Sequence, residues 1–362
     1  MATDLIYMPT FRSRQQENLV LRSFEFGQHM YPMIEIIKEY DRKRDEDKQQ
    51  PFHEIYGGLI SDIKADQVFV DLPLYLKERA SMKAEVITFS RGTIARIERR
   101  TEALMALAPL APKVIPVVSS YLHKTGEVDS LEQQTSQLRQ HFPYIAYRIL
   151  YNHFQEDWPI VSELATENDF IILDLDTIAP YPSPAIRQII SAWRGFTTCP
   201  KTVLRSAINT DIQNVGLDHA EIVYDADNGL LDMYSTAFAA QSFGDYSGIK
   251  KDDLTSGGTI SPGFLFYDAV NNQFIGYKGE IKNLSEFETT IVPAVLHSDA
   301  AQAMQASGLP YLDERNWGWQ TLLRIQSGAE SGKSQAKFKR ISMEHYLHCM
   351  RVKIEAGELT TG

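Results

Sequence analysis

A series of eight short apolar runs between residues 5 and 244 constrains the fold most strongly. Most of the runs are continuous rather than alternating, which is typical of parallel strands covered on both faces. They are rich in β-branched and aromatic residues, and polar stretches separate them. In order, the runs are LIYMP (5–9), YPMIEII (31–37), QVFVDL (67–72), KVIPVVS (113–119), YIAYRIL (144–150), FIILDLD (170–176), KTVLRSA (201–207) and FAAQSFG (238–244).

The stretches between these runs show helical signals. In residues 91–108, apolar side chains recur at helical spacing opposite Arg and Glu. Ser183 stands where a helix N-cap is expected, and Pro184 follows it in the first turn. We predict helices over 12–26, 53–65, 91–108, 129–142 and 183–193.

Eight strands alternating with helices over about 250 residues match the size of a (β/α)₈ barrel. The competing fold is an open, doubly wound sheet. No G-x-G-x-x-G turn follows the first run, which weakens the dinucleotide-binding form of that alternative. We therefore predict a TIM-type (β/α)₈ barrel, with the runs from 5 to 244 in one closed parallel sheet.

The pattern changes after residue 245. Residues 255–280 hold two β-prone runs joined around Asn271-Asn272, which predicts a hairpin outside the barrel. A helical stretch follows, and the chain ends in a basic amphipathic helix. We therefore expect a barrel over residues 1–250, and a hairpin and helical extension over 251–362 that packs on it.

Two further segments are unusually rich in charged residues. EYDRKRDEDKQQ (39–50) predicts a charged surface loop or a frayed helix. In the last helix, the apolar side is expected from Met343, Leu347, Met350 and Ile354. The charge of that helix comes from Lys337, Lys339, Arg340, Arg351 and Lys353.

The net charge, the cysteines and the N-terminus limit which kinds of protein this chain can be. Asp plus Glu (47) exceed Lys plus Arg (36), so a formal charge of −11 opposes non-specific binding of nucleic acid. Cys199 and Cys349 are too few for a disulfide framework and lack metal-site spacing. The N-terminus has no secretion-signal pattern, and no apolar run approaches a membrane span. These features predict a cytoplasmic protein that does not enter a membrane.

Charged residues inside the apolar runs are the candidates for chemistry. A (β/α)₈ barrel carries its active site where the strands end, and buried charges are costly unless they are paired or bound. The candidates are Glu35, Asp71, Arg148, Asp174, Asp176 and Arg205.

Two interpretations of these residues stay open. Glu35, Asp71 and Asp174 would form a carboxylate cluster that holds Mg²⁺ or Mn²⁺, with Asp176 nearby. Arg148 and Arg205 would then bind a phosphate or carboxylate group. The alternative is a structural network of ion pairs that closes the mouth of the barrel.

A second candidate is FGDYSGIK (243–250), which follows the last run. Gly244 and Gly248 allow unusual backbone angles around Asp245 and Tyr246. The functional interpretation is a loop at the mouth that presents an acid and a phenol. The structural alternative is a plain turn with an Asx interaction.

Several common catalytic motifs are missing. The sequence has no H-E-x-x-H, no histidines paired with cysteines at zinc spacing and no G-x-S-x-G elbow. GAESGKS within residues 327–337 is similar to a phosphate-binding loop, but Ser327 stands where the first glycine is required. We therefore expect neither a zinc enzyme nor a P-loop nucleoside triphosphatase.

Several segments follow one another in a recognisable order along the chain. YMPTFRSRQQENLVLRSF is followed by MYPMIEI, VFVDL, IPVVS, YRI, FIILDLD and FGDYSG, and later by WGWQTLL and HYLHCM. This order resembles the beta protein family of phages and bacteria. The resemblance implies a single unit with a barrel-like α/β core, found in phages, prophages and mobile elements.

The resemblance also matches individual residues of this chain to positions in the family pattern. Glu35 matches the P-x-I-E segment of the family, Asp71 and Asp174 match its strand-end aspartates, and Asp245-Tyr246 match its G-D-Y segment. This chain departs from the family in the hairpin, where GFLFYD (263–268) lacks an expected basic residue.

These observations lead to a first functional hypothesis and an alternative. The mouth of the barrel would bind a small anionic, phosphate- or nucleotide-like ligand. The protein would then act as a metal-dependent hydrolase or phosphodiesterase through Glu35, Asp71, Asp174, Asp245 and Tyr246. The alternative is a non-catalytic protein that binds a ligand or a protein partner in phage–host conflict. A nucleic-acid role through the basic last helix is disfavoured by the net charge.

Overall fold

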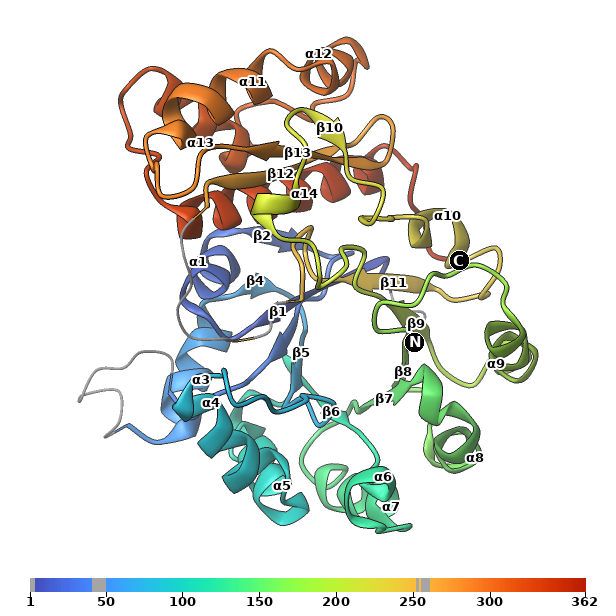
Figure 1. Ribbon diagram of the computed structural model, residues 1–362. Helices are drawn as coiled ribbons and strands as arrows, with labels where there is room; N and C mark the ends of the chain where they lie inside the picture. The colour runs from blue at the N-terminus through green and yellow to red at the C-terminus, as the bar shows by residue number, and fades with distance from the viewer. Residues whose placement is uncertain (1–3, 41–49, 252–253, 255–260) are drawn as a thin grey trace.

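Eight parallel strands close into a barrel in the order β1-β11-β9-β8-β7-β6-β5-β3 (Figure 1). The computed structural model describes residues 4–40, 50–251, 254 and 261–362, so most of the charged segment predicted at 39–50 lies outside the described residues. The predicted barrel is confirmed, because each of the eight runs contributes a strand. The strands are β1 (Tyr7–Arg12), β3 (Met33–Glu35), β5 (Val68–Asp71), β6 (Val114–Val118), β7 (Ala146–Leu150), β8 (Phe170–Asp174), β9 (Lys201–Leu204) and β11 (Ser242–Asp245).

Helices surround the barrel on its outside (Figure 1). The stretch predicted as one helix over 91–108 is divided, because Arg96 is extended between a π-helical turn (Ser90–Ile94) and α5. The predicted N-cap of α9 is confirmed, with the Ser183 hydroxyl accepting a hydrogen bond from the Ile186 N–H at 3.2 Å. The helices are α1 (Gln15–Ser23), α3 (Phe52–Asp62), α4 (Ala84–Phe89), α5 (Ile97–Met105), α6 (Leu122–Thr125), α7 (Ser130–Leu138), α8 (Phe154–Leu164), α9 (Pro184–Arg194) and α10 (Leu230–Met233).

The interior of the barrel is packed with side chains rather than open. Met33, Phe69 and Ile172 belong to an apolar cluster inside the sheet. Side chains two residues apart on a strand point to the same face. Glu35 and Asp71, two residues after Met33 and Phe69, therefore also face the inside at the carboxyl ends of their strands.

The predicted hairpin is confirmed and lies outside the barrel. β12 (Gly263–Asp268) pairs antiparallel with β13 (Gln273–Lys278). β10 (Glu221–Ile222) adds a third strand, so the part of the chain before residue 250 also contributes to this sheet. A second small sheet pairs β2 (Glu25–Gly27) with β4 (Lys64–Ala65). The remaining helices are α11 (Val292–Leu296), α12 (Asp299–Ala306), α13 (Trp317–Gln326) and α14 (Gln335–Glu355).

α14 differs from the basic amphipathic helix with one apolar side that its sequence predicted. It contacts α1, α13 and β12, so it is buried on more than one side. Buried residues such as Phe338, Tyr346 and Cys349 lie off the predicted apolar side and mark these further contacts. Its basic side chains all pair with carboxylates, which come from Glu330, Glu17, Glu344, Glu355 and Glu358. The helix therefore presents no unpaired basic row of the kind that nucleic-acid binding would require.

Within the part of the chain that the structure describes, no helix combines the length and the apolar character needed to cross a bilayer.

Candidate functional site

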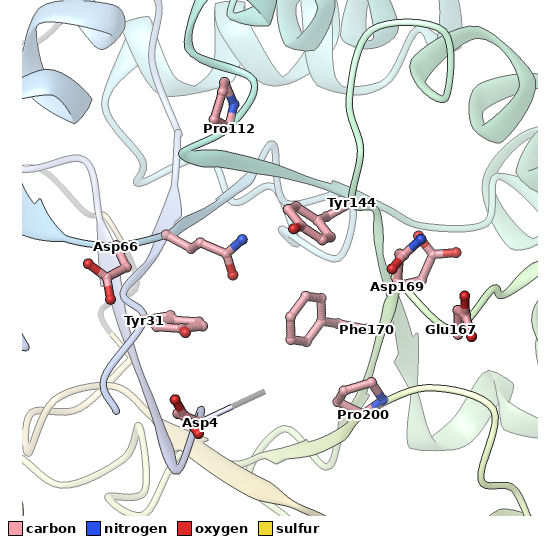
Figure 2. A pocket seen from close by; sticks show the side chains of 11 residues that line it. Asp4, Tyr31, Asp66, Pro112, Tyr144, Glu167, Asp169, Phe170 and Pro200 are labelled. Carbon is pink, nitrogen blue, oxygen red and sulfur yellow. The ribbon is translucent and has the colours of Figure 1, made fainter. Parts of the chain in front are cut away.

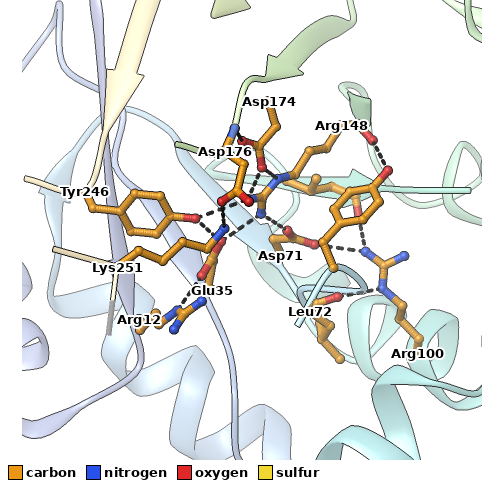
Figure 3. A network of polar contacts seen from close by, with 12 residues as sticks. Arg12, Glu35, Asp71, Leu72, Arg100, Arg148, Asp174, Asp176, Tyr246 and Lys251 are labelled. Atoms are coloured by element: carbon orange, nitrogen blue, oxygen red, sulfur yellow. Dashed lines mark hydrogen bonds and ion pairs between the residues drawn. The ribbon is translucent and has the colours of Figure 1, made fainter. Parts of the chain in front are cut away.

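Arg148 is the centre of a buried network at the carboxyl ends of the barrel strands (Figure 3). Its Nη1 donates to Glu35 Oε1 at 2.8 Å and to Asp71 Oδ2 at 2.6 Å. Its Nε and Nη2 donate to Asp174 Oδ2 at 3.0 and 2.6 Å, and Nη2 also donates to the Tyr246 hydroxyl at 3.3 Å. A guanidinium group has five N–H donors, so these contacts use all of them.

Two more arginines reach the same carboxylates from outside the centre. Arg12 Nε donates to Glu35 Oε2 at 2.9 Å, and Arg100 Nη2 donates to Asp71 Oδ1 at 2.9 Å. Arg100 is held in turn by the Leu72 and Val117 carbonyl oxygens. Glu35 and Asp71 are therefore each shared by two guanidinium groups, which offsets the cost of burying these carboxylates.

Tyr246, Lys251 and Asp176 extend the network beyond the residues that contact Arg12 and Arg100. The Tyr246 hydroxyl donates to Glu35 Oε1 at 2.8 Å, and Lys251 Nζ lies 5.3 Å from the centre of the Tyr246 ring. Lys251 Nζ pairs with Asp176 Oδ1 at 3.1 Å, and their side chains are 15% and 38% exposed. Asp176 has a φ of 54°, and Ser247 has a φ of 55°. Such backbone conformations carry strain that is frequent at functional sites.

The electrostatics of the network follow from this geometry. Burial acts to raise the pKa of Glu35, but Arg148 and Arg12 outweigh it, so that pKa lies well below its usual range. Burial also raises the pKa of Tyr246 to about 12, and the Glu35 carboxylate adds to the shift. Both groups thus keep their ordinary charge at neutral pH. A carboxylate with so low a pKa is a weak proton acceptor, so Glu35 is better suited to positioning than to general-base catalysis.

The lowered pKa of Glu35 predicts how stability depends on pH. Because the unfolded chain binds this proton more readily than the folded one, the contribution is complete above the ordinary pKa of Glu and is lost as pH falls below it. The Glu35→Gln variant should therefore lose less stability than the wild type between about pH 5 and pH 3. Urea denaturation at several pH values measures this slope. Equal slopes for the two proteins would contradict the ion-paired state of Glu35.

The structure brings most of the predicted site residues together. Glu35, Asp71, Asp174 and Arg148 are in direct contact, and Tyr246 joins them. Asp176 is linked to this group through Lys251 and through its own N–H, which donates to Asp174 Oδ1 at 2.8 Å. A catalytic role for these residues stays a prediction.

Arg205 does not belong to the network that was expected to include it. Its Nε donates to the Ile178 carbonyl oxygen at 2.7 Å, and its Nη1 donates to the Asp227 carbonyl oxygen. Its ion-pair partner is Asp227, at 3.5 Å. Arg205 therefore stabilises the loops beside the barrel by donating to their backbone carbonyl oxygens. Sequence reasoning did not anticipate this because Arg205 follows β9, which ends at Leu204.

Asp245 also lies apart from the network, although its neighbour Tyr246 is part of it. Successive side chains of a strand point to opposite faces, so an inward Tyr246 places Asp245 outside the barrel wall. There Asp245 accepts hydrogen bonds from the Tyr7 hydroxyl at 2.7 Å and from the Tyr346 hydroxyl of α14. Its role in this structure is to join the barrel to α14.

Glu35, Asp71 and Asp174 were predicted to bind a metal ion together. In the structure, a guanidinium group lies between their carboxylates. Each of the three directs an oxygen to Arg148. In the described residues, no group of three or more His, Cys, Asp or Glu side chains is arranged to hold a metal ion. The arrangement therefore does not fit the Mg²⁺ or Mn²⁺ site that the three carboxylates suggested.

Sequence reasoning missed Arg12, Arg100 and Lys251. Arg12 could have been found by continuing the first run with a period of two from Met8, which faces the barrel interior. Arg100 had been assigned to the charged face of its helix, although it is fully buried. The sequence around Lys251 gives no comparable signal.

A pocket of about 360 Å³ lies at the opposite end of the barrel (Figure 2). Its lining comes from residues just before the strands, including Gln67, Tyr144, Asp169 and Pro200, and from Phe170 at the start of β8. Barrel enzymes carry their chemistry at the other end, so this pocket is not the candidate active site.

The fold and site define a class: a (β/α)₈ barrel whose carboxyl-terminal mouth is closed by a buried arginine–carboxylate network. The family model described as Beta protein matches residues 7–351, so the chain belongs to the beta protein family. This confirms the family indicated by the sequence. No curated protein matches the chain.

Proposed function

We propose that the protein binds a small anionic ligand at the carboxyl-terminal mouth of the barrel, with Lys251 as its cationic contact. The observation that carries this proposal is the place of Lys251 at the edge of the network, where it is 15% exposed and pairs with Asp176. Its carboxylate partner Asp176 is the more exposed member of the pair. An anion can therefore replace Asp176 at Lys251 without disturbing the buried ion pairs.

This proposal moves the predicted anion contact away from Arg148. The guanidinium group of Arg148 already donates to three carboxylates and a phenol, so it has no donor left for a ligand. Arg148 instead holds the buried carboxylates and Tyr246 in place beneath the ligand. The low pKa of Glu35 and the occupied carboxylates favour binding over metal-assisted hydrolysis. Action in phage–host conflict and a cytoplasmic location stay predictions from the sequence.

Calorimetric titration with inorganic phosphate and with ADP tests the proposal. We expect the wild type to bind at least one of these anions, and Lys251→Met to bind it at least about tenfold more weakly. Asp176→Asn should bind it as tightly as the wild type or more tightly, because the competing carboxylate is gone while Asn still tolerates the left-handed backbone.

Lys64→Met is the matched control, since Lys64 pairs with Glu25 on the exposed small sheet. It should leave the titration unchanged. The proposal fails if neither anion binds the wild type, or if Lys251→Met and the wild type bind equally.

A further inference from the structure

Asp157 differs from the other buried carboxylates of the described residues. It lies in the first turn of α8, is 1% exposed, and neither of its oxygens has a hydrogen-bond partner. Burying a carboxylate without a partner is costly, so each such case requires an explanation. Every other buried Asp or Glu forms at least one hydrogen bond or ion pair, namely Glu17, Glu35, Asp71, Asp169, Asp174, Asp245, Asp268 and Glu344.

Aromatic and polar side chains from neighbouring loops surround Asp157. The Tyr75 phenol and the His123 ring lie close enough to interact with it electrostatically, and the Ser120 hydroxyl stabilises its charged form as a nearby donor. The His123 and His153 rings stack with centroids 3.5 Å apart, and the Tyr75 and His153 rings stack at 6.3 Å. These residues follow β5, β6 and β7, so the group lies at the carboxyl-terminal end of the barrel.

The group adjoins the arginine network, and the Arg148 guanidinium lies 5.9 Å from the centre of the Tyr75 ring, but the Asp157 oxygens themselves have no hydrogen bond to an arginine. The Tyr75 hydroxyl donates to the Arg148 carbonyl oxygen at 3.2 Å, which ties the two together. The guanidinium groups of Arg148 and Arg100, however, are directed at other carboxylates. Burial raises the pKa of Asp157, although Ser120 and His123 oppose the shift. Asp157 therefore lacks the cation that its counterparts in the network have.

We propose that Asp157 anchors a second binding site, which takes the protonated amine of a small organic cation. An ammonium group is the natural complement of a buried carboxylate, and it would donate charge-assisted hydrogen bonds to the two unpartnered oxygens. His123 is exposed, so among the side chains near Asp157 its side chain is the one that would move aside to admit the amine. This site is independent of the anion contact at Lys251.

The test uses putrescine as the cation and 1,4-butanediol as its neutral isostere, with the full chain at constant ionic strength. We expect putrescine to bind in a calorimetric titration and to raise the melting temperature, and 1,4-butanediol to do neither. Asp157→Asn keeps the shape and removes the charge, so it should bind putrescine roughly tenfold to hundredfold more weakly. Glu156→Gln, which changes the exposed carboxylate next in sequence, should bind like the wild type.

Two results would overturn the proposal. One is a wild type that does not distinguish putrescine from 1,4-butanediol, and this comparison does not depend on any variant folding. The other is a folded Asp157→Asn variant that binds putrescine as tightly as the wild type. Either result would make Asp157 a buried structural acid only. Neither result bears on phosphate or ADP binding, so the two proposals fail separately.

Discussion

Replacing Arg148 with methionine is expected to lower the free energy of unfolding by about 3–5 kcal/mol. Methionine fills similar space but has no N–H donor. Glu35, Asp71 and Asp174 would then stay buried close to one another without their shared partner. Urea denaturation measures the loss, and Arg148→Lys should also destabilise, because an ammonium group cannot reproduce the forked contacts.

The control is Arg99→Met, which removes an exposed ion pair with Glu102 at 3.7 Å. Exposed pairs contribute only about 0–1 kcal/mol, so this variant should unfold almost like the wild type. An unchanged unfolding midpoint for Arg148→Met would contradict the buried network. A large loss would also mean that Arg148 variants cannot serve as tests of ligand binding, because they would report on the fold.

Replacing Gly248 with alanine is expected to cost about 2–6 kcal/mol of stability, since it combines backbone strain with overpacking. Gly248 has a φ of 71°, and a Cβ there would lie 2.4 Å from Cγ of Tyr346. Tyr346 is the residue of α14 whose hydroxyl donates to Asp245, so the clash would push α14 away from the barrel. Thermal and urea denaturation would both show the loss.

Gly58→Ala is the matched control for this variant. Gly58 lies inside α3, and a Cβ at this position has no heavy atom within 4 Å. Alanine is favoured over glycine in a helix, so stability should stay the same or rise by up to about 1 kcal/mol. Equal stability of Gly248→Ala and the wild type would show that α14 does not pack against the loop after β11 as described.

The barrel could be predicted because its strands are buried on both faces and therefore appear as continuous apolar runs. The least regular strands were also the least distinct in sequence. β1 continues through Thr10 to Arg12, beyond the run that ended at residue 9, and β11 begins only at Ser242. Arg12 reaches the network, and Ser242 contacts Thr202 in the buried part of the sheet, so these polar residues do not appear in a search for apolar runs.

The central residues of the network were also predictable. A charge inside an apolar strand must find a partner, and parallel strands bring such charges to the same end of a barrel. This reasoning found Glu35, Asp71, Arg148 and Asp174. It did not show that Arg148 would contact all three carboxylates, because the direction of a side chain depends on register across strands that are distant in sequence.

The environment of α14 was harder to predict. Residues such as His345 and Tyr346 are polar or amphipathic, so they did not extend its apolar side in the sequence. In the structure His345 contacts the Tyr267 carbonyl oxygen at 2.8 Å, and Tyr346 joins Asp245 and Asn228. These partners lie far away in the chain, and only the tertiary fold brings them together.

A double-mutant cycle between Arg148 and Asp174 tests the central claim most directly. Unfolding free energies are measured for the wild type, Arg148→Met, Asp174→Asn and the double variant. The described contacts at 2.6 and 3.0 Å predict that the double variant is more stable than the sum of the single losses implies, by about 1–3 kcal/mol. Strictly additive losses would mean that the two side chains do not interact, and would contradict a network centred on Arg148.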